Sequence, residues 1–158
     1  MAVSTIPAFK AALLARLQAD AGLSGVQITY GHPYPLQPAD EMVFLGNSVG
    51  ANPTLATNAP AGQSSAAIGQ YRREERYTLD VFASVHKHNR EIQKTVTERA
   101  FAIAGVVETS LRVWTGENPA FGGVVRWALV TGLDHVETVD VDNRYADVHI
   151  VVACAARI

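Results

Sequence analysis

The stretch from Gln70 to Lys87, QYRREERYTLDVFASVHK, constrains the fold more than any other part of the chain. Alternate residues from Tyr71 to Val85 fall on one face of an extended chain, a period of two that predicts a β-strand. A single strand of this length would span roughly 55–60 Å, whereas the radius of gyration of a compact chain of this size is about 15 Å. We therefore expect the charged first half, RREER, to project beyond the body of the fold, and the apolar second half to lie in the core.

Composition limits the classes of protein to which the chain can belong. Its 158 residues are 48% hydrophobic and 18% charged, which suits one globular domain over residues 1–158. The net charge of -2 provides no overall positive field for nucleic acid or anionic lipid. Cys154 is the only cysteine, so an intramolecular disulfide and a cysteine zinc site are excluded. No segment has the roughly 18 uninterrupted apolar residues of a membrane span.

Two segments have the period of a helix. In the first, Ser4 or Thr5 can cap a helix that has Pro7 in its first turn and ends before Gly22. In the second, Asn89 can cap a long helix that ends at TGENP, residues 115–119. Its apolar stripe should pack across the sheet and consists of Ile92, Val96, Ala100, Ile103, Val107, Leu111 and Trp114.

The remaining regular segments are strands. Short strands are expected at VQITYG, residues 26–31, and EMVFLG, residues 41–46. Two long strands close the chain around the turn DVDNR, where Asp142 and Asn143 suit a hairpin and Gly132 marks a bulge in the first strand. This order predicts an α+β fold: a mostly antiparallel sheet packed against two helices, with a closing β-hairpin.

The histidines and acidic residues do not form a pattern typical of catalysis. His86 and His88 lie on one strand face, but Lys87 separates them and no acidic residue follows until Glu91, so a solvated face is favoured over a metal site. There is neither a nucleophile motif nor a glycine-rich phosphate loop. We expect no enzyme activity, no catalytic residues, no cofactor and no metal.

Residues 46–69, GNSVGANPTLATNAPAGQSSAAIG, predict a long loop or arm without a charged side chain. Its small and apolar side chains suit a surface that lies on another protein, with Val49, Leu55 and Ile68 as partner contacts. The neighbouring RREER presents both signs of charge and can pair with a copy of itself. We expect a homo-oligomeric ring whose subunit interface contains Arg72, Arg73, Glu74, Glu75 and Arg76.

The chain resembles the tail terminator, or tail completion, proteins of long-tailed bacteriophages, which are also described as minor tail or head-tail joining proteins. The resemblance covers nearly the whole chain and lies in the order of FKAALLARLQADAGLSGVQITYGHP, EMVFLG, RREERYTLDVFASV, ERAFAIAGVVETSLR and HIVVACAARI. The loop over residues 46–69 is longer than the family's pattern.

The resemblance implies a virion structural protein assembled in the bacterial host cytoplasm. It would form a ring, a hexamer in this family, at the head-proximal end of the tail tube. That ring would stop tube polymerisation and join the tail to the head connector, and DNA would pass through it without sequence-specific binding. Its partners would be its own copies, the tail tube protein and the connector or stopper protein.

Two alternatives stay open at this point. Head-completion or stopper proteins of the phage neck have a similar size and also form rings. A soluble ligand-binding or enzymatic α+β domain, with residues 46–69 as a lid, would instead be a monomer or dimer with a concave polar pocket.

Overall fold

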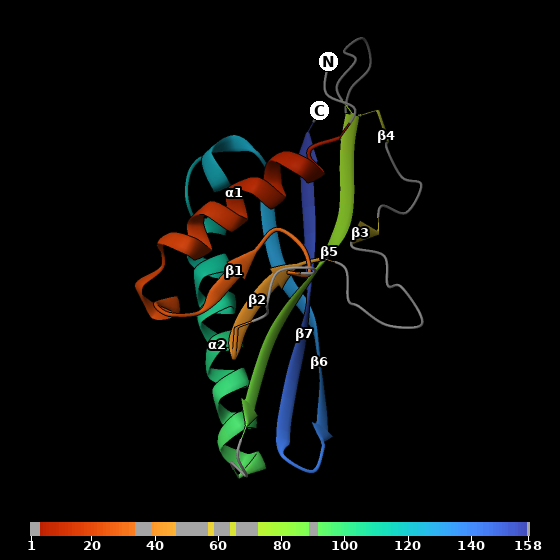
Figure 1. The fold of residues 1–158 in the computed structure, drawn as a ribbon. Helices are drawn as coiled ribbons and strands as arrows, with labels where there is room; N and C mark the ends of the chain where they lie inside the picture. Colours follow the sequence, from red (N-terminus) through yellow and green to blue (C-terminus); the bar gives the residue numbers. More distant parts are fainter. Residues whose placement is uncertain are drawn as a thin grey trace.

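The computed structural model describes residues 4–33, 39–46, 57–58, 64–65, 73–88 and 92–157. In these residues one helix, five strands, a second helix and two further strands follow one another, with short 3₁₀ turns at Ala21–Leu23 and Ala120–Gly123 (Figure 1). The helices are α1 (Ile6–Ala19) and α2 (Gln93–Thr115). The strands are β1 (Gln27–Thr29), β2 (Glu41–Leu45), β3 (Thr57–Asn58), β4 (Ser64–Ser65), β5 (Arg73–His88), β6 (Trp127–Val139) and β7 (Asn143–Arg157).

The strands form one sheet in the order β1-β2-β5-β7-β6, and β3 and β4 also pair with β5. β1 and β2 are parallel, whereas every other pair is antiparallel. The predicted α+β class with a mostly antiparallel sheet is therefore confirmed. Neither helix of the described residues has the length and apolar character that a membrane span needs.

β5 is the central strand of the sheet, and it is paired along its length. On one side it pairs with β7 from Glu74 opposite Arg157 to His88 opposite Asn143. On its other side β4, β3 and β2 follow one another. The expectation that RREER projects beyond the fold is therefore wrong for its described part, because β7 is nearly as long as β5. The molecule accommodates the long strand by being elongated along it (Figure 1).

Part of the segment expected to be a structureless loop belongs to the sheet. Thr57 lies opposite Leu79, and Ser64 lies opposite Glu74, both in antiparallel pairing with β5. The predicted partner contacts, Val49, Leu55 and Ile68, lie outside the described residues.

The core lies between the sheet and the two helices, which cover the same face of it (Figure 1). α1 contributes Phe9, Leu13 and Leu17, and the alternating side chains of β5 from Tyr77 to Val85 face them as predicted. The predicted α2 stripe is buried at Val96, Ala100, Ile103, Val107 and Leu111, and Trp114 packs against the core.

The predicted start of α2 is wrong by several residues. The helix begins at Gln93, and Ile92, which we expected in the apolar stripe, is its N-cap and is 71% exposed. The cap has no side-chain hydrogen bond. Asn89, the expected cap, lies outside the described residues.

The closing hairpin has the predicted form. The Asp140 amide donates to the carbonyl of Asn143 across the turn at 3.0 Å. The register between β6 and β7 shifts between Val130 and Gly132, where the bulge was expected. Such a bulge increases the local twist of the strand.

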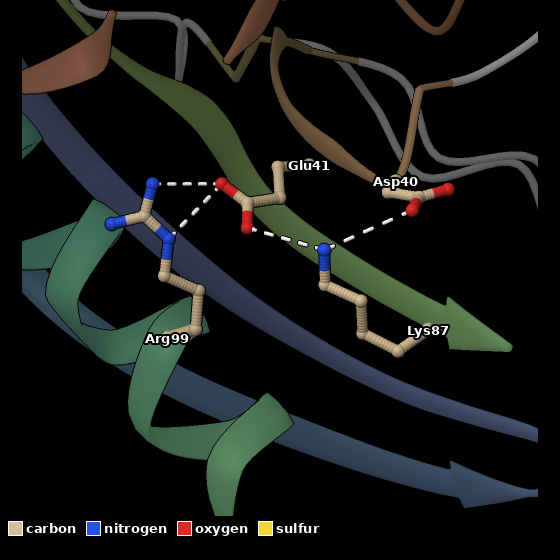
Figure 2. Close-up of polar contacts among 4 residues, drawn as sticks. All are labelled: Asp40, Glu41, Lys87 and Arg99. Carbon is tan, nitrogen blue, oxygen red and sulfur yellow. Dashed lines mark hydrogen bonds and ion pairs between the residues drawn. The ribbon is translucent and has the colours of Figure 1, made fainter. Parts of the chain in front are cut away.

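A charged cluster connects α2 to β2 and β5. Arg99 donates two hydrogen bonds to one carboxylate oxygen of Glu41 on β2, from Nε at 3.0 Å and from an Nη at 2.7 Å (Figure 2). Lys87 Nζ lies 3.5 Å from the other oxygen. These hydrogen bonds hold the pKa of Glu41 below its usual value, which outweighs the opposite effect of its burial. Glu41 therefore stabilises the fold as an anion.

Replacement of Glu41 by Gln should lower the free energy of unfolding at pH 7 by about 1 kcal/mol, and the melting temperature by roughly 2–4 °C. The pKa of Glu41 is lower in the folded chain than the value of about 4.3 expected in the unfolded chain. Its contribution is hence complete above that value and is lost as the pH falls through the folded pKa. The melting temperatures of the wild type and of Glu41→Gln should therefore converge as the pH is lowered from 7 to 3.

Glu98→Gln is the matched control, because among the described residues Glu98 forms only an exposed helix pair with Lys94 at 3.5 Å. It should have little effect at any pH. A destabilisation of Glu41→Gln that stays constant down to pH 3 would contradict the role assigned to the Glu41 carboxylate.

Candidate assembly interface

The predicted subunit interface lies where β5 begins, beside the end of β7. Arg72 is outside the described residues, and the backbone of Arg73 pairs with Ser65 of β4. Glu74, Glu75 and Arg76 continue the strand opposite Arg157, Ala156 and Ala155. Because side chains alternate along a strand, these three residues do not share one environment.

Glu75 faces the helices and is only 2% exposed. Its carboxylate accepts hydrogen bonds from the Ser4 hydroxyl at 2.5 Å, from the Thr5 amide at 2.8 Å and from the Thr5 hydroxyl at 2.7 Å. Thr5, one of the two residues expected to cap α1, is its N-cap, but the Thr5 side chain makes no capping hydrogen bond and is directed to Glu75 instead. Ser4 Oγ does accept from the amide of Ile6, at 3.1 Å. Glu75 therefore fixes the start of α1 against the sheet.

The Glu75 carboxylate lies beside the buried side chain of Tyr77, which is 2% exposed. Burial raises the pKa of the Tyr77 phenol well above its usual value. A carboxylate in such a place is costly unless it is hydrogen-bonded, and Ser4 and Thr5 supply the donors.

Glu74 and Arg76 lie on the opposite face of β5 and form an exposed ion cluster with Arg126. Glu74 Oε1 is 3.6 Å from a guanidinium nitrogen of each arginine. The side chains of Arg76 and Arg126 are 69% and 53% exposed, so both can reach a second molecule. Of the predicted residues whose side chains the structure describes, Glu74 and Arg76 remain available for a contact.

The β6 strand is one margin of the sheet, and among the described residues it pairs only with β7. Four large apolar side chains of this strand are between 46% and 61% exposed: Leu129, Leu133, Val136 and Val139. We call this strand the β6 edge. Arg126, which directly precedes it, makes the β6 edge continuous with the ion cluster.

The sequence pattern did not identify the β6 edge, because alternation does not reveal which strand ends the sheet. An unpaired strand edge with exposed apolar side chains is a template for pairing with another chain. The burial of Cys154 meanwhile raises the pKa of its thiol, which makes it a poor nucleophile.

The sequence matches no known protein family, and it matches no curated protein. Its structure is similar to a chain in the solved structure of the virion of a native gene transfer agent (GTA) particle. The TM-score is 0.59 and the sequence identity is 17%, and the match covers 98% of this chain and 100% of that chain. At this identity the likeness shows a shared fold, and it extends over both chains from end to end.

Proposed function

We propose that this protein is a virion structural protein that forms a ring at the head-proximal end of a phage-like tail and ends tube polymerisation there. The observation that carries the proposal is the likeness, over 98% of this chain and all of the other, to a chain of a gene transfer agent virion. Fold alone does not define function, so the surface must support the same conclusion.

The surface supports assembly through two adjoining features. The β6 edge offers backbone groups and apolar side chains to a second copy of this chain, and the ion cluster of Glu74, Arg76 and Arg126 offers both signs of charge beside it. A head-to-tail contact of this kind repeats around a closed ring. The apolar side chains would provide affinity, and the charges would fix orientation.

In the proposed particle the ring contacts the tail tube protein on one face and the head connector or stopper protein on the other. A hexamer would match the family that the sequence resembles. DNA passes through the ring without sequence-specific binding, and the net charge of -2 is consistent with a surface that does not hold phosphate strongly. The protein would thus reside in the virion after assembly in the host cytoplasm.

The main alternative, a head-completion or stopper protein, would also form a ring. The two differ in what they act on, since only a terminator limits the length of the tail tube. A ligand-binding or enzymatic domain would instead need a concave site built around a few convergent polar groups.

The decisive experiment combines native mass spectrometry and electron microscopy of the protein with polymerising tail tube protein. We expect hexameric rings, alone or at tube ends, and tubes that stop growing when the protein is added. Rings that leave tube length unchanged would support a stopper. A protein that stays monomeric with tubes present would refute the proposed function.

The β6 edge can be tested by Val136→Lys, because a lysine on an edge strand opposes pairing with another strand. Val136 is 61% exposed, so the subunit should fold with an unchanged melting temperature. Assembly should weaken by roughly tenfold or more, measured by light scattering against concentration. Glu108→Lys on the exposed surface of α2 is the control and should assemble normally. Equal assembly of the wild type, Val136→Lys and Glu108→Lys would exclude the β6 edge from the ring contact.

The charged contact can be tested by Arg73→Glu together with Arg76→Glu, which makes residues 73–76 uniformly acidic. The subunit should fold, because Glu75 and the apolar half of β5 are unchanged. Assembly should be impaired at low salt and partly restored at 1 M salt, where the Debye length is about 3 Å. Light scattering and circular dichroism across a salt series would measure both effects.

Lys94→Glu together with Arg112→Glu changes the net charge by the same amount on exposed positions of α2. If this control loses assembly to the same extent, the effect is one of overall charge, and the start of β5 is not a specific contact. Normal assembly of the Arg73→Glu, Arg76→Glu variant at low salt would also show that the start of β5 is not a specific contact.

A further inference from the structure

Three side chains of metal-ligating type converge where β5 ends, at the opposite end of the strand from Glu75. They are Asp40, His86 and His88, and one donor atom from each lies within 4.8 Å of the other two. The sequence argued against a metal here because no acidic residue lies near the two histidines along the chain. The fold supplies the missing carboxylate from another strand.

The strand register explains why these residues meet. The His86 amide donates to the carbonyl of Asp40 at 2.7 Å, which places the two residues opposite each other just beyond the start of β2. His88 lies two residues further along β5 and therefore on the same face. This is the face of the sheet opposite the two helices, since the odd-numbered residues of β5, such as Val81, Ala83 and Val85, face the core.

The His86 ring is fixed but incompletely satisfied. It stacks on the Tyr145 ring with centroids 4.3 Å apart and planes 3° from parallel. Its Nε2 atom is buried and has no hydrogen-bond partner among the residues that the structure describes. A buried ring nitrogen without a partner is unfavourable, and coordination of a cation would satisfy it.

The His88 ring is held by Asn143 on β7. Its Nδ1 lies 2.5 Å from the Asn143 side-chain oxygen. That oxygen only accepts, so Nδ1 carries the proton and Nε2 keeps its lone pair. A hydrogen bond of this type, from one ring nitrogen to an outer partner, is the arrangement that orients metal-binding histidines.

We propose that Asp40, His86 and His88 bind a divalent transition metal ion of the Zn²⁺ type. Imidazole and carboxylate are donors that Zn²⁺ accepts, and three protein ligands leave a fourth position for water. Donors in a tetrahedral zinc site lie about 3.3 Å apart, and these donors lie within 4.8 Å of one another, so each pair must approach by at most about 1.5 Å. Asp40 and His88 are exposed and can make this movement while His86 stays in place.

The local charge balance permits the ion. Lys87 Nζ lies 3.8 Å from an Asp40 oxygen, but it is also 3.5 Å from Glu41, which can keep it when Asp40 turns to the metal (Figure 2). The bound ion would then link the start of β2 to the end of β5, at the opposite end of the sheet from Glu75. Its binding would stabilise the folded subunit through mass action.

The test is titration of untagged subunit with ZnCl₂, followed by isothermal calorimetry and by the melting temperature. Wild type should bind one Zn²⁺ per chain and melt at a higher temperature with the ion. His86→Ala and His88→Ala should each abolish stoichiometric binding, and Asp40→Asn should weaken it at least about tenfold. Asn143→Ala should weaken it by roughly 10–100-fold, as loss of an outer-shell partner does.

His135→Ala is the matched control, because His135 is also exposed on a strand and lies 3.8 Å from a carboxylate, that of Glu137. It should bind Zn²⁺ like wild type, and circular dichroism should show every variant folded. Absence of stoichiometric binding to wild type, or equal binding by wild type and His86→Ala, would overturn the proposal. Because the readout uses the subunit alone, it is independent of whether the protein forms a ring.

Discussion

The pairing of β5 with β7 along their whole length is the constraint on which the rest of the structure depends. It places Glu74 beside Arg157 at one end and His88 beside Asn143 at the other. A shift of this register by one residue would turn every core side chain of β5 to the outer face. The pairing therefore determines which side of the sheet the helices cover, and it sets the position of every polar cluster along the strand.

The two ends of β5 are secured in different ways. At its start the buried Glu75 accepts three hydrogen bonds from Ser4 and Thr5, which ties α1 to the sheet. Near its end the half-buried Glu41 on β2 joins Arg99 of α2 and Lys87 of β5. In both cases a carboxylate at the sheet is satisfied by groups remote in sequence. These contacts orient the helices, while the apolar core between them supplies most of the free energy of folding.

Much of the architecture could be predicted from periodicity, because the burial of β5 and α2 follows periods of 2 and 3.6. The polar details could not. RREER reads as an exposed charged run, yet the fourth of its five charges, Glu75, is buried, since hydrogen-bond donors from residues 4 and 5 compensate it. The start of α2 was misplaced because Ile92 fits the apolar stripe but lies one residue before the helix. The carboxylate of Asp40 reaches His86 only through strand pairing, so no local pattern contains it.

The balance of forces at the proposed ring contact favours the β6 edge over the ion cluster as the source of affinity. Glu74 already has Arg76 and Arg126 within 3.6 Å in the single chain, so a partner's charges would exchange with existing pairs. Exposed ion pairs contribute only about 0–1 kcal/mol even when they are new. Removal of the four exposed β6 side chains from water has no such competing interaction in the free subunit. Charge at the start of β5 would therefore act on orientation and salt dependence, and the apolar strand edge on the strength of the contact.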